Sequence, residues 1–138
     1  MFFKDKVVWL TGASSGVGEA AAYAFNKEQA KLILSSHEPE ELERVKNNCS
    51  FEAENIMLLP FNLTEHDKIP GLAEHVLEKF GKIDILFNIG GVSQRSLVKE
   101  TSLEIDKRLM DINYFGAVAL TKAVLPSMIK NKSGHIAA

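Results

Sequence analysis

Apolar residues gather in short runs, and longer stretches with a helical spacing of apolar positions separate these runs. Most short runs are continuous rather than alternating, which is typical of strands covered on both faces. We expect strands near Val7–Leu10, Leu32–Ser35, Ile56–Pro60 and Ile83–Asn88, and a fifth that starts at Ile136. Strands that alternate with helices in this way predict a parallel sheet with crossover helices.

Four helices are expected between these strands, at Val17–Gln29, Pro39–Asn48, Lys68–Phe80 and Ser102–Lys130. Pro39 suits a first helical turn, where its missing N–H costs no hydrogen bond. The segment Thr101–Glu104 has the spacing of a capping box, with Thr101 as the cap and Glu104 reaching back. These signals support the helical boundaries that the apolar spacing predicts.

The last predicted helix is unusually long and would span about 45 Å at about 1.5 Å per residue. Pro126 lies inside it, so we expect a kink there. Helical spacing predicts a buried stripe made of Ile105, Leu109, Ile112, Phe115, Val118 and Ala119. This stripe could pack on the chain's own sheet alone or also against a partner subunit.

Composition sets limits on the class of protein. Its 138 residues, 46% of them apolar, suit a single domain with a core, residues 1–138. A net charge of −2 gives no electrostatic footprint for nucleic acid or an anionic membrane. Cys49 is the only cysteine, and the four histidines lack metal-ligand spacing, so we expect neither a disulfide nor a metal site. Met1–Phe3 is too short for a signal peptide or a membrane span, and we expect a soluble cytoplasmic protein.

The segment Thr11–Gly18 carries the strongest chemical signal. It joins the first predicted strand to the first helix, the setting in which glycine-rich turns hold a dinucleotide phosphate. In order, its three glycines would allow a tight turn, a close backbone approach to the pyrophosphate and close packing of the helix. The expected phosphate-binding residues are Gly12, Ser14, Ser15, Gly16, Val17 and Gly18. The alternative is a glycine-rich turn that binds nothing.

Further segments, together with this one, resemble the short-chain dehydrogenase/reductase family. The family carries Thr-Gly-x-x-x-Gly-x-Gly after its first strand and Asn-Asn-Ala-Gly after its fourth, which reads Asn88-Ile89-Gly90-Gly91 here. Asp111–Gly116 resembles the helical segment with the Asn of the family's catalytic tetrad, here Asn113. Val92–Leu97 and Leu125–Met128 look like the carbonyl-, retinoid- or steroid-reducing branch. The resemblance extends from about Lys6 to Ala138.

The resemblance implies a fold and a chemistry. The fold would be a Rossmann-like doubly wound parallel sheet in three α/β/α layers, truncated after the fifth strand. Hydride transfer in the family uses a Tyr as proton donor, a Lys four residues later, a Ser and the Asn, of which only Asn113 has a match here. Tyr23 and Lys27 have the Tyr-x-x-x-Lys spacing but lie in the helix after the glycine turn, away from the nicotinamide end. Asn113 could instead be a helical Asn that bonds locally.

The end of the second predicted strand bears on the choice of dinucleotide. By the resemblance, Ser36 stands where an acidic residue would accept the ribose hydroxyls of NAD, and His37 where relatives that bind NADP often carry Arg. Ser36 can donate to a 2′-phosphate and protonated His37 adds positive charge, whereas Glu38 works against an anion. We therefore expect NADP in preference to NAD. His37 could equally be a solvated loop residue.

Three other positions are expected beside the cofactor. Asn62 and Leu63 fall where the family has Asp-Val or Asp-Leu next to the adenine ring, and Asn88 and Gly90 follow the fourth strand. Asn62 and Asn88 could also be turn residues at strand ends. Asp84 lies within a buried strand, where a carboxylate needs partners, and we expect a structural role for it.

The sequence therefore predicts the cofactor-binding half of an NADP(H)-dependent oxidoreductase that acts on an alcohol/carbonyl pair. The alternatives are a non-catalytic dinucleotide-binding module and an α/β domain without a ligand. The resemblance also implies a homodimer or homotetramer through helix 102–130. Because the family covers this helix with further elements, we expect the 138 residues alone to be poorly soluble or loosely packed. A sharp, cooperative melt of the monomer would contradict that expectation.

Overall fold

Five parallel strands form one sheet in the computed structural model, which describes residues 1–138. The strands are β1 (Val7–Thr11), β2 (Lys31–Ser35), β3 (Ile56–Leu58), β4 (Ile85–Phe87) and β5 (His135–Ala137). Their order across the sheet is β3-β2-β1-β4-β5, so the chain builds outward from β1 and then crosses over to β4. The carboxyl ends of β1 and β4 thus form a topological switch point, where open α/β sheets bind ligands.

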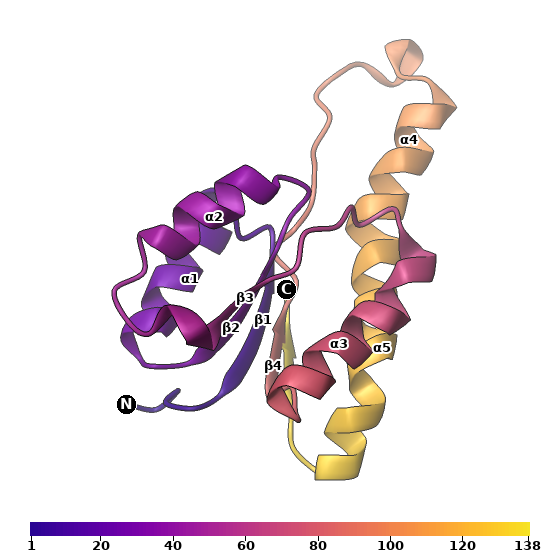
Figure 1. Ribbon diagram of the computed structural model, residues 1–138. Coiled ribbons are helices and arrows are strands. Elements are labelled where there is room, and N and C mark those ends of the chain that lie inside the picture. Colours follow the sequence, from indigo (N-terminus) through magenta and orange to yellow (C-terminus); the bar gives the residue numbers. More distant parts are fainter.

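Helices cover both faces of the sheet (Figure 1). α1 (Gly16–Lys27) and α2 (Pro39–Asn47) pack on one face, and α3 (Ile69–Phe80) and α5 (Gly116–Asn131) pack on the other. Successive strand residues point to opposite faces of the sheet, so Val8 and Leu10 pack under α1 and α2, while Trp9 packs under α3 and α5. The predicted three-layer, doubly wound parallel sheet is confirmed.

The strand positions agree with the predictions, and their ends differ by a few residues. β3 stops at Leu58, β4 is limited to Ile85–Phe87, and β5 starts one residue early at His135. Asp84 lies just before β4, where its carboxylate accepts a hydrogen bond from the Val7 N–H at 2.8 Å and pairs with Lys82 at 2.9 Å. These partners fit the structural role that was expected for Asp84.

The long helix is continuous from Leu103 to Asn131 and has an irregular turn in its middle. α4 (Leu103–Met110) leads into a π-helical turn at Asp111–Phe115, and α5 then continues through Pro126. The departure from α-helical geometry therefore lies at the π turn and not at the predicted proline kink. The predicted cap was also wrong, because Ser102 accepts from the Ile105 N–H while Thr101 donates to the Leu97 carbonyl.

The predicted buried stripe on this helix was only partly right. The buried residues are Ile112, Gly116, Leu120, Val124 and Met128. Ile105 is 37% exposed and Phe115 is 48% exposed. Figure 1 shows that α4, which carries Ile105, extends beyond the sheet.

The same helix, Leu103–Asn131, is long and apolar enough to cross a membrane by length and composition, since an 18-residue window of it has a mean hydropathy of 1.3. The core helix of a soluble protein can meet the same criterion, and α5 contributes Leu120, Val124 and Met128 to the core. This feature is therefore weak support for a membrane span.

Candidate functional site

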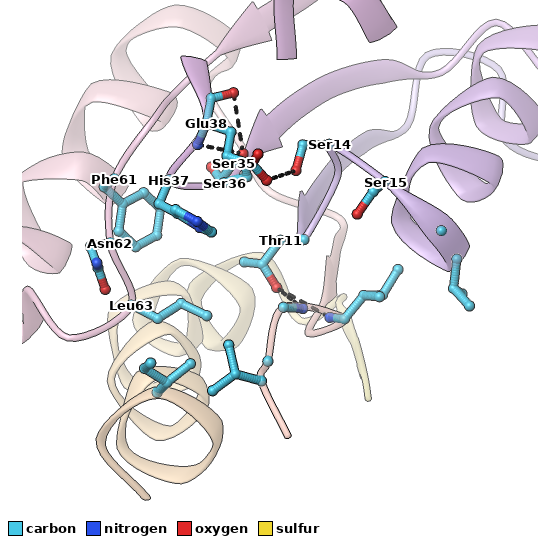
Figure 2. A pocket seen from close by; sticks show the side chains of 18 of the residues that line it. Thr11, Ser14, Ser15, Ser35, Ser36, His37, Glu38, Phe61, Asn62 and Leu63 are labelled. Atoms are coloured by element: carbon cyan, nitrogen blue, oxygen red, sulfur yellow. Dashed lines mark hydrogen bonds between the residues drawn. The ribbon is translucent and has the colours of Figure 1, made fainter. Parts of the chain in front are cut away.

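A cleft of about 430 Å³ opens at the carboxyl end of the sheet, over the switch point between β1 and β4 (Figure 2). Its walls come from the turn after β1, the turn after β2, the segments after β3 and β4, and one face of the long helix. They comprise residues 11, 12, 14–17, 35–38, 61–63, 89–92, 108 and 112. The cleft has the size of a small-molecule site.

Two glycines of the turn after β1, Gly12 and Gly18, have the geometry that was expected of them. Gly12 has a φ of +62°, and a Cβ there would lie 2.8 Å from the Gly90 Cα, so the turn passes directly against the end of β4. A Cβ on Gly18 would lie 1.9 Å from the Gly12 carbonyl oxygen, so only glycine lets α1 pack this closely on the turn. Gly16 has open space where its Cβ would be and lines the cleft.

The amino terminus of α1 faces this cleft without a side-chain cap. Ser15 stands at the N-cap position, and its side chain makes no capping hydrogen bond. The first N–H groups of a helix have no intrahelical partner, and together with the helix dipole they attract anions. The open cradle at Gly16 and the uncapped helix end therefore fit the pyrophosphate of a dinucleotide.

Thr11 ties the end of β1 to the end of β4. Its hydroxyl oxygen accepts the N–H of Ile89 at 3.1 Å and that of Gly90 at 2.9 Å, and the residue is 2% exposed (Figure 2). One side chain from the neighbouring strand thus accepts two backbone N–H groups of the cleft wall, of which that of Ile89 also donates to the Phe87 carbonyl at 3.1 Å. The sequence identified Thr11 only as part of the motif and did not predict this contact.

Glu38 contacts both of the serines that were expected to meet phosphate groups. The Ser14 hydroxyl donates to Glu38 Oε1 at 3.3 Å, and the Ser36 hydroxyl oxygen accepts the Glu38 N–H at 3.0 Å (Figure 2). His37 lies beside them at the cleft wall and is exposed. Ser35, which is buried, accepts from the indole N–H of Trp9 at 2.8 Å.

A charged network behind the glycine turn escaped the sequence reasoning. Arg44 of α2 donates to the Ser14 carbonyl at 3.1 Å and pairs with Glu19 of α1 and Glu41, each at 2.8 Å. Hydrogen bonds from Arg44, and then from Tyr23, lower the pKa of Glu19 from 4.5 to about 2. The Tyr23 hydroxyl donates to Glu19 at 2.8 Å and is not part of the cleft wall, as expected for its place in α1.

The residues after β3 and β4 are placed unequally. Asn62, Leu63 and Gly90 line the cleft, but the Asn62 side-chain oxygen accepts from Thr64 at 3.0 Å, which is the turn role left open for it. Asn88 does not line the cleft, and its side-chain oxygen is buried without a hydrogen-bond partner. Asn88 and Gly18 are therefore the two expected cofactor residues that the cleft wall does not include.

Asn113 lies in the π turn and holds the loop that follows β4. Its side chain accepts the Val92 N–H at 2.8 Å and donates to the Val92 carbonyl at 2.7 Å. These partners are 21 residues away, so the alternative of a local helical bond is wrong. Arg108 and Ile112 also reach the cleft wall, and their i,i+4 spacing on one helical face was the signal that could have found them.

Comparisons with known proteins agree with this geometry. Residues 6–138 match the family model for short chain dehydrogenase. The chain is 49% identical over 136 residues to Dehydrogenase/reductase SDR family member 7 of Mus musculus, covering 96% of this chain and 40% of that protein. It is 45% identical over 135 residues to Dehydrogenase/reductase SDR family protein 7-like of Drosophila melanogaster, covering 95% of this chain and 41% of that protein. A crystal structure of a short chain dehydrogenase from Bacillus anthracis superposes with a TM-score of 0.90 at 29% identity, covering 95% of this chain and 53% of that one.

Proposed function

The chain belongs to the short-chain dehydrogenase family, and from this premise we propose that it forms the dinucleotide-binding part of an NADP(H)-dependent oxidoreductase. The observation that carries the proposal is the uncapped amino terminus of α1, which opens onto a glycine cradle at the switch point of the sheet. The chain spans about 40% of the length of the mouse relative, so the activity of the whole protein is part of the proposal.

Different segments of the cleft wall would hold different parts of the proposed cofactor. The turn from Gly12 to Val17 would hold the pyrophosphate through backbone N–H groups and the Ser14 and Ser15 hydroxyls. The turn after β2, with Ser36 and His37, and the Asn62-Leu63 segment would contact the adenosine. When bound, a nicotinamide dinucleotide supplies or accepts the hydride at an alcohol or carbonyl carbon.

The chain's own residues would orient the reaction from the opposite end of the cleft. Thr11 holds Ile89 and Gly90 against the glycine turn, and Asn113 fixes both backbone groups of Val92. The role of Asn113 in a proton relay remains a prediction from the family resemblance. The loop beyond Val92 would border the site of a small alcohol or carbonyl substrate.

The preference for NADP, the cytoplasmic location and the assembly are further parts of this proposal. Neutral Ser36 and the imidazole of His37 favour the 2′-phosphate of NADP, whereas an acidic residue at this place would favour the ribose hydroxyls of NAD. Exposed apolar side chains on the long helix favour association into a homodimer or homotetramer. These side chains are Leu103, Ile105, Met110, Tyr114, Phe115, Leu125 and Ile129.

A titration with NADPH and NADH tests the proposed binding. Trp9 donates to Ser35 on the cleft wall, so its fluorescence provides a probe next to the site. We expect saturable quenching or enhancement and a rise in melting temperature with both dinucleotides, with the lower Kd for NADPH. Absence of binding by either dinucleotide would contradict the proposal.

A second candidate is a dinucleotide-binding module without catalysis. The observation that favours it is that the Tyr23 hydroxyl is engaged by Glu19 outside the cleft wall, so this Tyr-x-x-x-Lys pair does not serve the site. The two candidates differ in a single-turnover assay with the full-length protein, NADPH and a panel of aldehydes and ketones. Oxidation of NADPH that depends on a carbonyl compound supports the enzyme, and binding without oxidation supports the module.

A further inference from the structure

We infer that Arg44 is a positioning residue for pyrophosphate binding, because it compensates the charge of Glu19 beside the glycine turn and holds the Ser14 carbonyl toward α2. This inference rests on the proposed function, since it concerns how the same turn holds a dinucleotide phosphate. Arg44 lies in α2 and is not among the residues of the cleft wall, so it would act through the turn without touching the ligand.

The guanidinium of Arg44 joins the glycine turn to two helices. Its Nη2 donates to the Ser14 carbonyl at 3.1 Å and to Glu19 Oε2 at 3.0 Å, and its Nη1 donates to Glu19 Oε1 at 2.8 Å. Its Nε donates to Glu41 at 2.8 Å. All three guanidinium nitrogens are thus engaged, and the planar fork that allows this has no counterpart in the single ammonium group of a lysine.

The contact with the Ser14 carbonyl sets the direction of the next amide group. A trans peptide is planar, so the Ser15 N–H points opposite to the Ser14 carbonyl and therefore away from Arg44. Ser15 lines the cleft, and its N–H makes no hydrogen bond within residues 1–138. Arg44 would therefore keep this free donor available to a phosphate oxygen, the kind of group that a backbone N–H at a helix start binds.

Glu19 is the reason why a positive charge is needed behind the turn. It lies in the first turn of α1, the helix whose uncapped amino terminus faces the cleft, and an ionised carboxylate there opposes an incoming anion. Hydrogen bonds from Arg44, and then from Tyr23, lower its pKa to about 2, so Glu19 is ionised at neutral pH. The Glu38 carboxylate accepts the Ser14 hydroxyl and adds a second negative charge beside the turn. Without Arg44, a pyrophosphate would meet a Glu19 carboxylate that has no cation paired with it.

The test compares Kd values for NADPH and NADH in the full-length protein and in its Arg44→Met variant. Both Kd values should rise by the same factor of about tenfold, which corresponds to about 1.4 kcal/mol, because both dinucleotides carry the same pyrophosphate. Lys46→Met is the matched control, because it removes the same charge from α2, while Lys46 forms no ion pair and does not line the cleft. Its Kd values should change by less than about twofold, since a solvated charge is screened by salt.

Glu19→Gln gives a result that damage to the fold cannot imitate. It removes the negative charge beside the turn and leaves Arg44 in place, so both Kd values should fall by about threefold although an ion pair is lost. In the double variant Arg44→Met/Glu19→Gln, both Kd values should return to within about threefold of the wild type, because the uncompensated carboxylate is gone. Glu19→Gln also decides the matter where Arg44→Met does not fold.

Three results would overturn the inference and leave the proposed function intact. They are unchanged Kd values in Arg44→Met, no recovery in the double variant, and weaker binding by Glu19→Gln. A change confined to one of the two dinucleotides would overturn it as well, since the pyrophosphate is common to both. A wild-type protein that binds neither dinucleotide would overturn the proposed function and this inference with it.

Discussion

Replacing Thr11 by Val should destabilise the protein while leaving its packing volume unchanged. The hydroxyl oxygen of Thr11 is the acceptor for the N–H groups of Ile89 and Gly90, at 3.1 and 2.9 Å. The Ile89 N–H also donates to the Phe87 carbonyl at 3.1 Å, so only the half-buried Gly90 N–H would lose its sole acceptor, and such a loss costs about 1–3 kcal/mol. We therefore expect Thr11→Val to lower the free energy of unfolding by about 1–3 kcal/mol, a large share of the usual 5–15 kcal/mol.

Urea unfolding of the full-length protein, followed by circular dichroism, measures this loss. Thr11→Ser is the control, because it keeps the hydroxyl and removes only a methyl group, and it should cost about 1 kcal/mol or less. The slope of the free energy against urea should be the same in all three proteins, since the surface exposed on unfolding is unchanged. A loss below about 0.5 kcal/mol in Thr11→Val, or an equal loss in Thr11→Ser, would refute the argument that this hydroxyl joins β1 to β4.

Three further predictions concern the turn, the loop after β4 and the charged network. Gly18→Ala should lower the free energy of unfolding by about 3 kcal/mol or more, because its Cβ would lie 1.9 Å from a backbone oxygen. Gly71→Ala is the control, because Gly71 lies in α3 with open space around it, and it should be neutral or stabilising by about 0.5–1 kcal/mol. Thermal melts of both variants measure the difference. Asn113→Ala should remove both hydrogen bonds to Val92 in the loop after β4 and so speed hydrogen exchange of the Val92 amide. An unchanged exchange rate would contradict the view that Asn113 holds this loop. The lowered pKa of Glu19, about 2 instead of 4.5, means that its contribution to stability is present above pH 4.5 and is lost as the pH falls toward 2. Arg44→Met should therefore lose less stability than the wild type over that pH range in acid titrations, and equal losses would contradict the ion pair's role.

The sheet and its order of elements could be predicted because the strands are continuous apolar runs. Val7, Val8, Trp9 and Leu10 are all fully buried, since helices cover both faces of β1, and no other element type explains such a run next to a glycine turn. The predicted start of β2 differs from the observed one by a single residue. Strand ends were less predictable, because hydrogen bonding to a neighbour decides where a strand stops.

The long helix shows why tertiary contacts limit prediction from periodicity. Helical spacing marked Ile105 as buried, but burial needs a layer opposite, and α4 extends beyond the sheet. The π turn at Asp111–Phe115 was not predicted, and two of its residues contact distant segments. His66 contacts the Asp111 carbonyl at 2.8 Å, and Asn113 holds Val92, and neither contact has a local sequence signal.

The candidate site was predictable where backbone geometry demands a residue type and unpredictable where side chains meet across segments. Gly12 and Gly18 were correctly assigned their geometry, because a Cβ at either position would overlap backbone atoms. Arg44 and its partners Glu19 and Glu41 were missed, because α1 and α2 meet only in the folded protein. The contact between Glu38 and Ser14 has the same origin, 24 residues apart in the chain.

Leu63 explains why two glycines outside the phosphate turn are needed at the cleft. A Cβ on Gly90 would lie 2.9 Å from Leu63 Cδ1, and a Cβ on Gly116 would lie 3.0 Å from Leu63 Cβ. Leu63 therefore fills the space between the end of β4 and the start of α5, while it also lines the cleft on the side assigned to adenine. Because His66, three residues after Leu63, contacts the Asp111 carbonyl in the π turn, one short stretch of chain joins the proposed adenosine side of the cleft to the helix that carries Asn113. Substitution of Leu63 should consequently alter both the adenine side of the cleft and the position of Val92. Substitution of a residue that contacts only adenine would leave Val92 in place.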